Sequence, residues 1–187
     1  PGHDRGSSHG DTRVIRKAYF EDPAYVPLLH RAYDGWAAVE AESGRALFNR
    51  TGLIEVGPPD GEVVPGVLRA AEEHRLDVEA LSAEDISRRF PGFQVPDGMV
   101  GVYEADGGVL NVEACVEAHA ALAQARGATL MTGVEVLGWR PDGEGVLIET
   151  TSGSVRAGAL IVTAGAWAPD LLEAIGLPLQ VKRKVLL

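Results

Sequence analysis

The sequence predicts a chain of the α/β class in which helices and strands are mixed along the length. Apolar residues recur at helical spacing over 25–39 and again over 112–122. Two successive hairpin patterns occupy 134–153. A short apolar run at 160–162 then leads through glycine and alanine into a further helix. Together these patterns are typical of a sheet that is covered by helices.

The most informative run in the chain is 6–16, which reads Gly-Ser-Ser-His-Gly-Asp-Thr-Arg-Val-Ile-Arg. Its glycines allow backbone to approach a ligand closely, because they lack a Cβ atom. Asp11 or Thr12 is expected to cap a helix, whose first free N–H groups would face an anion. On such a helix Arg13 and Arg16 share one face, and two guanidiniums suit a carboxylate or phosphate. A polar loop with two solvated arginines is the alternative.

A long amphipathic helix is predicted after this run. Asp22 suits the N-cap, and Pro23 suits the first helical position because the N–H group that proline lacks is not needed there. Apolar residues then recur at helical spacing until the helix ends near the Ser-Gly pair at 43–44. A strand is predicted within 48–56, and the turn sequence Gly-Pro-Pro-Asp-Gly at 57–61 closes it.

Two short helices and one strand are predicted next. The first helix covers 67–74. Ser82 followed by Asp85 resembles a capping box, so a second helix is expected there, stopping before Pro91. The segment 99–104 is predicted as a strand.

The clearest supersecondary pattern begins at Asn111, which is expected to cap a helix. Gly127 stands where the end of this helix favours glycine, and 128–132 is predicted as a strand. After the hairpins, 160–162 is predicted as a strand buried on both faces, with a helix from about Pro169. Such a strand and its Gly/Ala turn would bring backbone against a ligand at the strand's C-terminal end.

Composition and charge argue against several classes of protein. The 187 residues carry a formal net charge of −10, whereas a general binder of nucleic acid needs a basic surface to neutralise phosphates. No apolar run reaches the ~18 residues of a membrane span, and no signal peptide is visible. The single cysteine, Cys115, is expected to fill the core, and its isolation fits a reducing compartment. We therefore expect a cytoplasmic protein.

Several motifs are absent from the sequence. It has no Cys/His spacing typical of a metal site, no Walker loop and no Gly-x-Gly-x-x-Gly fingerprint. The chain begins at Pro1 within a polar loop and ends in the apolar residues 185–187. We therefore expect an internal fragment of a longer protein. From the missing Cys/His spacing we expect no metal site.

The run 6–16 resembles a loop of the monomeric sarcosine oxidases and N-methyltryptophan oxidases, which reads Gly-Ser-(His/Ser)-His-Gly-(Asp/Glu)-Thr-Arg-(Ile/Val)-Ile-Arg. The order and spacing of this match are specific. Two later stretches resemble the D-amino-acid-oxidase-like flavoenzymes more broadly. They are Asp-Gly-Gly-Val-Leu-Asn at 106–111 and Val-Thr-Ala-Gly-Ala-Trp at 162–167. The similarity spans nearly the whole chain.

The resemblance implies a division of the chain. Residues 1–16 would form a flavin-contacting loop and the start of a helix, and 17–105 mainly a portion of a mixed-sheet substrate domain. Residues 106–187 would form the later part of a Rossmann-like FAD-binding domain with a β-meander. The unit with the dinucleotide fingerprint and the C-terminal half of the family's fold would lie outside this chain.

The resemblance also implies an activity. In that family FAD oxidises the C–N bond of a secondary amino acid such as sarcosine. The imine hydrolyses to an amine and an aldehyde, and oxygen reoxidises the flavin to give hydrogen peroxide. The implied partners are a small amino acid and oxygen, with no nucleic acid and no membrane, and the oligomeric state stays open.

The resemblance assigns roles to individual residues. Arg16 falls on the arginine that binds the substrate carboxylate. Arg13 falls on the arginine beside the flavin ring, where a fixed cation stabilises negative charge on the reduced flavin. Both are therefore expected to be catalytic. Ser8 replaces a histidine found in some members. The expected cofactor-binding residues are Ser7, Ser8, His9, Thr12, Arg13, Val134, Ala164 and Gly165.

Two alternatives remain open. The same fold can act on another amino acid, such as N-methyltryptophan, pipecolate or a D-amino acid. The chain can also be a truncated, non-catalytic α/β module, because it lacks the unit that grips the pyrophosphate of a dinucleotide. Alone, these residues are expected to bind FAD weakly or not at all and to be inactive.

Overall fold

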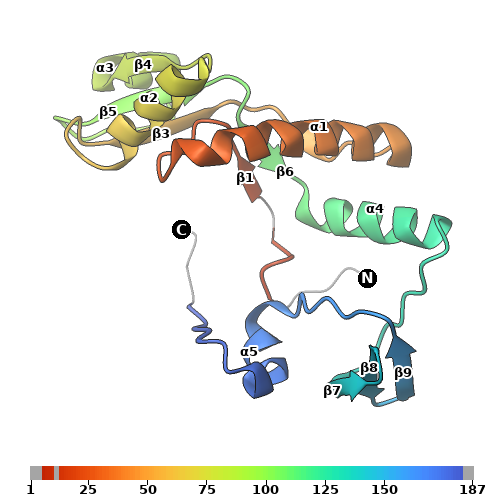
Figure 1. The fold of residues 1–187 in the computed structure, drawn as a ribbon. Coiled ribbons are helices and arrows are strands. Elements are labelled where there is room, and N and C mark those ends of the chain that lie inside the picture. The colour runs from red at the N-terminus through yellow and green to blue at the C-terminus, as the bar shows by residue number, and fades with distance from the viewer. Residues whose placement is uncertain (1–5, 11–12, 183–187) are drawn as a thin grey trace.

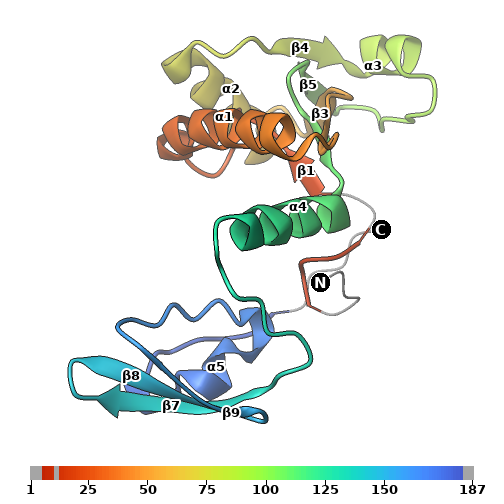
Figure 2. The same ribbon diagram turned by 90° about the vertical axis from the view of Figure 1, so that its right-hand side faces the viewer.

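The computed structural model describes residues 6–10 and 13–182. Figure 1 shows two regions: one contains helices α1 (Val26–Ser43) and α2 (Val63–His74) with two small sheets, and the other contains a three-stranded meander. Figure 2 shows the same two regions after a turn of 90°. The mixed helix-and-strand class predicted from the sequence is confirmed.

The first sheet joins the opening segment to the middle of the chain. Strands β1 (Arg13–Ile15) and β2 (Phe48–Asn49) both pair antiparallel with β6 (Gly108–Leu110), which lies between them. Arg13 stands opposite Leu110 in this pairing. The sheet therefore anchors the opening segment through residues that are distant in the sequence.

The helix predicted from Asp11 or Thr12 is wrong. Arg13–Ile15 is a strand, while Asp11 and Thr12 lie outside the described residues. The two β-branched residues of this strand favour extended backbone, and β6 supplies the hydrogen-bonding partner that a strand needs. Arg13 and Arg16 consequently do not share a helix face, and each is placed by its own contacts.

The long helix forms as predicted. The 3₁₀ turn η1 (Pro23–Tyr25) precedes α1, and the Asp22 side chain accepts a hydrogen bond from the Ala24 N–H at 2.9 Å. The helix ends at Gly44, whose φ of 66° lies in the left-handed region that favours glycine. Helix α1 packs against α4 (Val112–Ala125). The core beside these two helices consists of Leu47, Leu110, Cys115 and Ala118.

The predicted strand 48–56 divides between two sheets. Its later part belongs to β3 (Leu53–Gly57), which pairs antiparallel with β5 (Val100–Glu104), and β5 pairs in turn with β4 (Glu79–Ser82). The chain passes from the first sheet to the second around Gly52, which has φ of 71°. The strand predicted at 99–104 is confirmed as β5.

Helix α2 covers one face of the second sheet. It includes the predicted stretch 67–74 but begins earlier, at Val63. A Cβ atom on Gly66 would lie closer than 3.0 Å to the backbone of Phe20, so glycine allows the helix to approach that segment. The cluster buried between helix and sheet consists of Ala18, Val64, Val67 and Val102.

Helix α3 (Ala83–Arg89) begins with the capping box that the sequence predicts. The Ser82 hydroxyl oxygen accepts a hydrogen bond from the Asp85 N–H at 3.1 Å. In return, the Asp85 carboxylate accepts a hydrogen bond from the Ser82 N–H at 3.4 Å. The Ser82 hydroxyl also donates to the Asp85 carboxylate at 2.7 Å. This hydrogen bond, followed by the one from the Ser82 N–H, lowers the pKa of Asp85, with a smaller contribution from Arg88.

Replacing Ser82 by alanine is expected to lower the Tm of the protein by about 2–4 °C, because a first-turn N–H loses its partner. Thermal unfolding followed by circular dichroism measures this effect. Ser87→Ala is the matched control, since Ser87 lies exposed on the same helix and caps nothing. An equal change in Tm for both variants would contradict the prediction.

The two hairpins predicted from the sequence are confirmed. Strands β7 (Val136–Asp142), β8 (Gly145–Thr150) and β9 (Gly153–Ala157) form an antiparallel meander. Gly143 makes the first turn with φ of 62°. After the meander come the 3₁₀ turn η2 (Gly165–Trp167) and two short helical turns.

The strands predicted at 128–132 and 160–162 are wrong. Neither segment pairs with a strand of the described chain, and Ile161 is 85% exposed. An extended segment forms a β-strand only when its backbone N–H and C=O groups hydrogen-bond to a neighbouring strand. No described strand lies next to these two segments. The helix predicted near Pro169 forms as α5 (Ala168–Leu171), which the 3₁₀ turn η3 (Glu173–Ile175) follows.

The Asp-Gly-Gly turn at 106–108 requires glycine for packing. A Cβ atom on Gly107 would lie 2.7 Å from the Leu53 Cβ atom. A Cβ atom on Gly108 would lie closer than 3.0 Å to the backbone oxygen of Asn49. The two glycines therefore let β6 approach its neighbours, which is a structural reason for this motif.

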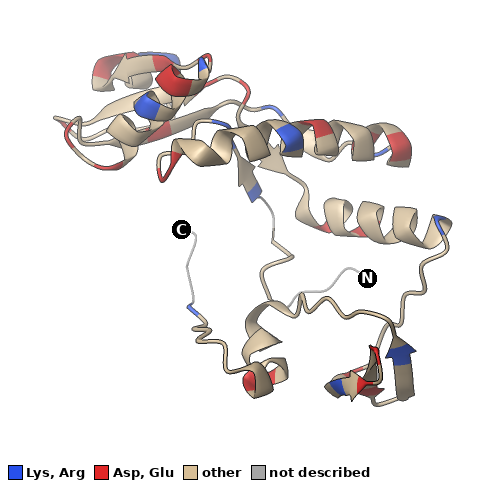
Figure 3. Ribbon diagram, viewed as in Figure 1, with Lys and Arg blue, Asp and Glu red and all other residues tan. Residues whose placement is uncertain are grey.

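The charged residues are interspersed on the helices, with both signs present on α1, as Figure 3 shows. Within residues 6–10 and 13–182, none of the helices combines the length and the hydropathy that a membrane span requires. The same residues contain no group of three or more His, Cys, Asp or Glu side chains that could hold a metal ion.

Candidate functional site

The opening loop, residues 6–10, lies against the turn η2 that follows the meander. Gly6 has φ of 71°, and a Cβ atom there would stand 3.3 Å from the Trp167 ring. Ser7 and Gly165 line one open hollow of about 330 Å³. Two of the predicted cofactor-binding positions, far apart in the sequence, therefore meet in space.

Arg13 holds the opening loop in a curled form. Its Nη2 atom donates hydrogen bonds to the backbone oxygens of Ser7 at 2.6 Å and of His9 at 3.3 Å. The Gly10 N–H donates to the carboxylate of Glu113 at 2.8 Å. This hydrogen bond is the main reason why the pKa of Glu113 is lowered. The loop is thus fixed from both sides, and the Arg13 guanidinium is fixed with it.

Arg13 lines a small hollow that has an apolar wall. This hollow has a volume of about 200 Å³. That is below the roughly 300–1,000 Å³ of ordinary ligand pockets, so it suits one part of a larger ligand. The residues around it are Ser7, Ser8, Arg13, Trp36, Leu110, Val112, Cys115 and Val116. The hollow thus combines one arginine and two serines with an aromatic–aliphatic wall.

A larger hollow adjoins the meander. Its volume is about 570 Å³, and it includes Ala164 and Trp167. The Trp139 ring N–H donates to the Leu171 backbone oxygen at 2.8 Å, which ties α5 to the meander. Val134 does not line this hollow, although the two residues after it do. Thr12 lies outside the described residues.

Arg16 stands apart from the hollow that Arg13 lines. Its Nε atom is 3.0 Å from a carboxylate oxygen of Glu55, and its Nη2 atom is 3.6 Å from a carboxylate oxygen of Glu21. The guanidinium lies over the Tyr19 ring, 4.4 Å from its centroid. The side chains of Arg16 and Glu55 are 16% and 13% exposed. Arg16 is therefore a half-buried cation that faces two carboxylates.

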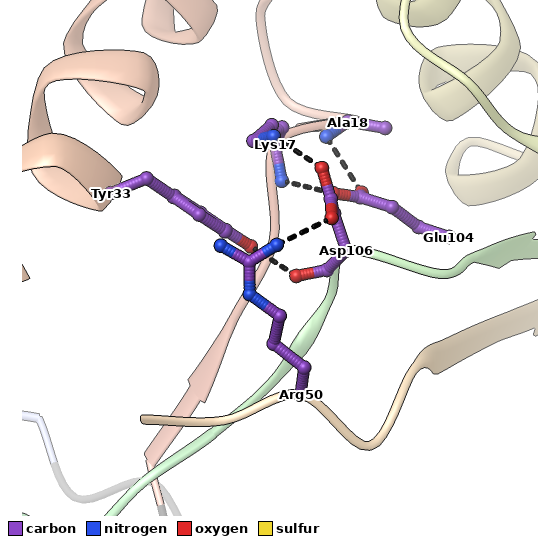
Figure 4. Close-up of polar contacts among 6 residues, drawn as sticks. All are labelled: Lys17, Ala18, Tyr33, Arg50, Glu104 and Asp106. Carbon is purple, nitrogen blue, oxygen red and sulfur yellow. Dashed lines mark hydrogen bonds and ion pairs between the residues drawn. The ribbon is translucent and has the colours of Figure 1, made fainter. Parts of the chain in front are cut away.

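The backbone after Arg16 is held by a buried carboxylate. Glu104 is 4% exposed and accepts hydrogen bonds from the N–H groups of Lys17 at 2.8 Å and Ala18 at 3.0 Å (Figure 4). A buried carboxylate with two such donors is well satisfied. Glu104 therefore positions the segment that carries Arg16.

Asp106 provides a second anchor beside this segment. Its carboxylate pairs with Lys17 at 2.6 Å and with Arg50 at 2.9 Å, as Figure 4 shows. The hydrogen bond from Lys17 is the main cause of the lowered pKa of Asp106. The Tyr33 hydroxyl donates to the Asp106 backbone oxygen at 3.0 Å, and burial raises the pKa of Tyr33.

Sequence reasoning identified the two arginines but missed Glu55, which faces Arg16, and Glu104, which holds the backbone after it. Glu55 lies opposite Val102 in the pairing of β3 with β5, and Glu104 is two residues further along β5. Side chains two apart on a strand share a face, so both carboxylates lie on the face with the buried Val102. A carboxylate at an inward position of an otherwise apolar strand is the signal that would have found them.

Comparisons with known proteins show which family this chain resembles. The family model described as "FAD dependent oxidoreductase" (DAO) matches residues 1–187. The chain is 42% identical over 186 residues to the monomeric sarcosine oxidase of Streptomyces avermitilis, covering 100% of this chain and 48% of the relative. It is 40% identical over 186 residues to the N-methyl-L-tryptophan oxidase of Escherichia coli K12, covering 99% of this chain and 50% of the relative. The chain thus spans about half the length of these relatives.

Solved structures give the same picture of the fold. The open form of a Tyr-to-Phe variant of NikD, an amino acid oxidase essential for nikkomycin biosynthesis, superposes with a TM-score of 0.84 at 32% identity. The alignment covers 93% of this chain and 45% of that one. Glycine oxidase from Geobacillus kaustophilus superposes with a TM-score of 0.76 at 23% identity over 93% of this chain and 49% of the other, which supports the fold alone.

Proposed function

The chain belongs to the family of FAD dependent oxidoreductases, and from this membership we propose that the full-length protein oxidises the C–N bond of an N-methyl amino acid such as sarcosine. The products would be an amine, an aldehyde and hydrogen peroxide. The observation that carries most weight is the opening loop, in which Arg13 is fixed by two backbone oxygens beside an apolar wall. A preorganised cation of this kind stabilises charge that develops during a reaction.

FAD, the cofactor of this family, would supply the acceptor for the hydride equivalent. The residues of this chain that would hold it are Ser7, Ser8, His9, Thr12, Arg13, Val134, Ala164 and Gly165. The contact of the opening loop with the Gly165 turn supports this set, because it brings Ser7 and Gly165 to one hollow. Arg13 would stabilise negative charge on the ring, as expected for a guanidinium that cannot lose its proton.

Arg16 would bind the carboxylate of the substrate. It is a partly buried guanidinium, and bidentate pairing with a carboxylate suits its planar fork. Because Arg16 lies apart from the hollow that Arg13 lines, Arg16 would bind the substrate while Arg13 contacts the cofactor. The small amino acid and oxygen would be the partners of the protein.

We also propose the division of the chain into residues 1–16, 17–105 and 106–187. The first would contact flavin, the second would belong mainly to the substrate domain, and the third would belong to the FAD-binding domain. The separate meander within the third segment supports this division. A reducing compartment, the cytoplasm, would suit the one cysteine in the sequence.

A second candidate is the same chemistry on N-methyltryptophan. The identities of 42% and 40% to the two named oxidases are too close to choose between the substrates. The alternative that this chain is a non-catalytic α/β module makes the opposite prediction, namely that no flavin is bound and nothing is turned over.

One experiment tests these proposals. The full open reading frame around this chain is expressed, its visible absorption is recorded, and peroxide release is measured with sarcosine and with N-methyltryptophan. The proposal expects a yellow protein that releases peroxide faster with sarcosine. Faster turnover of N-methyltryptophan would favour the second candidate, and a colourless protein without turnover would favour the non-catalytic module.

A further inference from the structure

The contact between Arg16 and Glu55 is close but poorly aligned. The Arg16 Nε atom is 3.0 Å from a Glu55 carboxylate oxygen, yet this buried Nε–H makes no hydrogen bond among the described residues. The second carboxylate, Glu21, is 3.6 Å from the Nη2 atom, beyond hydrogen-bonding distance. Within the described part of the chain, the guanidinium thus has two charged neighbours, and its buried Nε–H has no hydrogen-bonding partner.

A carboxylate ligand can improve on this arrangement. Two parallel N–H···O bonds to the planar fork are stronger than a single misaligned ion contact. A buried donor without a hydrogen bond also costs stability, which a better acceptor recovers. Glu55 is therefore a partner that an incoming carboxylate can replace.

When a ligand replaces Glu55 at Arg16, the Glu55 carboxylate loses the cation that balanced its negative charge. Glu55 is 13% exposed, and the charged groups that face it are Arg16 from the segment after β1, Glu21 from the segment before η1, and Glu104 from β5. Helix α2 contributes the apolar Val64 and Val67 on this side of the sheet. An anion bound to Arg16 would add one more negative charge to a site that already contains three carboxylates.

We propose that Glu55 takes up a proton from solvent when a carboxylate ligand binds to Arg16. Glu55 would then act as a positioning residue, which makes substrate affinity depend on pH. The inference rests on the proposed role of Arg16 in binding the substrate carboxylate. A buffer acid or hydronium ion loses the proton, which adds to one carboxylate oxygen of Glu55, and no other covalent bond changes.

Burial supports this proposal. It raises the pKa of Glu55 to about 7; Arg16 lowers that pKa, while Glu104 and Glu21 raise it further. A bound anion raises the pKa again, so the ligand binds best when Glu55 is already protonated. Affinity is then constant below about pH 7 and falls as the pH rises above 7, until the pKa of the bound state is reached.

Butyrate is a suitable probe, because it replaces the N–H group of sarcosine by a methylene and has no C–N bond to oxidise. Its binding to the flavin-loaded full-length protein is measured by isothermal titration calorimetry from pH 6 to pH 9. At pH 8 the titration is repeated in two buffers of different ionisation enthalpy, which gives the number of protons taken up. We expect nearly one proton for the unaltered protein.

The variant Glu55→Gln imitates the protonated carboxyl in shape and charge. It is expected to take up no proton and to bind butyrate about tenfold more tightly than the unaltered protein at pH 8, because only about a tenth of Glu55 is protonated one unit above a pKa of about 7. At pH 6 the two proteins are expected to bind equally. Glu79→Gln, at an exposed ion pair with Arg89, is the matched control and is expected to behave as the unaltered protein.

Each outcome decides the proposal. Binding without proton uptake by the unaltered protein overturns it, and this measurement does not require the variant to fold. Proton uptake that persists in Glu55→Gln but disappears in Glu21→Gln would show that Glu21 takes up the proton, and this result also overturns the proposal. Absence of butyrate binding to the unaltered protein also overturns the proposal. If the protein oxidises sarcosine while these tests fail, only this inference is lost; if it binds no flavin and oxidises nothing, the proposed function fails first.

Discussion

Replacing Arg16 by alanine in the full-length protein is expected to raise KM for sarcosine about 10- to 100-fold. A hydrogen bond between charged groups contributes roughly 1.5–3 kcal/mol, which corresponds to this range. The flavin absorption spectrum should keep its position, because Arg16 does not line the hollow that contains Arg13. Steady-state peroxide release and a visible spectrum of the same sample measure both effects.

Two further variants show whether the guanidinium itself is responsible. Arg16→Lys keeps the charge but loses the planar fork, so its KM should lie between those of the unaltered protein and the alanine variant. Arg45→Ala is the control, since Arg45 is an exposed arginine that pairs with Glu117 at 2.8 Å. An unchanged KM for Arg16→Ala would exclude it as the carboxylate-binding residue. Loss of flavin instead would indicate a structural role.

Gly108→Ala is expected to destabilise the protein by about 3 kcal/mol or more, at the upper end of the range for overpacked sites. The new Cβ atom would lie closer than 3.0 Å to the Asn49 backbone oxygen, and neither backbone can move without breaking the pairing of β2 with β6. Because β6 also pairs with β1, the damage should reach the loop that Arg13 holds. Urea unfolding followed by circular dichroism measures the loss, and the flavin content of the purified protein should fall with it.

Gly35→Ala is the matched control for this substitution. Gly35 lies within α1, and nothing stands within 4 Å of the position that its Cβ atom would take. Alanine should therefore stabilise the protein by about 0.5–1 kcal/mol, because it restricts the unfolded chain and suits a helix. Similar stabilities for Gly108→Ala and Gly35→Ala would contradict the packing explanation of the Asp-Gly-Gly motif.

The sequence by itself predicted those elements whose determinants are local. Asp22 caps the turn before α1, Ser82 and Asp85 form the capping box of α3, and Gly143 makes the first turn of the meander. In each case the interacting groups are a few residues apart, so the sequence contains both partners at a known spacing. The resemblance of the run 6–16 to the sarcosine oxidase loop led to the family in the same way.

The wrong predictions share a different cause. The segment 13–15 is a strand because β6 pairs with it, and 128–132 and 160–162 are not strands because no described strand stands beside them. Strand formation depends on a neighbour that the local sequence does not specify. Local propensity therefore could not decide these three segments.

The same distinction applies to the site. The sequence indicated Arg13 and Arg16 as cations of the site, but it placed both on one helix. The structure shows that Arg13 is held by the carbonyl groups of its own loop, whereas Arg16 faces Glu55 on a strand of another sheet. The register of β3 on β5 puts Glu55 and Glu104 on one inward face. Only the tertiary structure decides this, because the energy of a partly buried charge depends on which distant groups the fold brings against it.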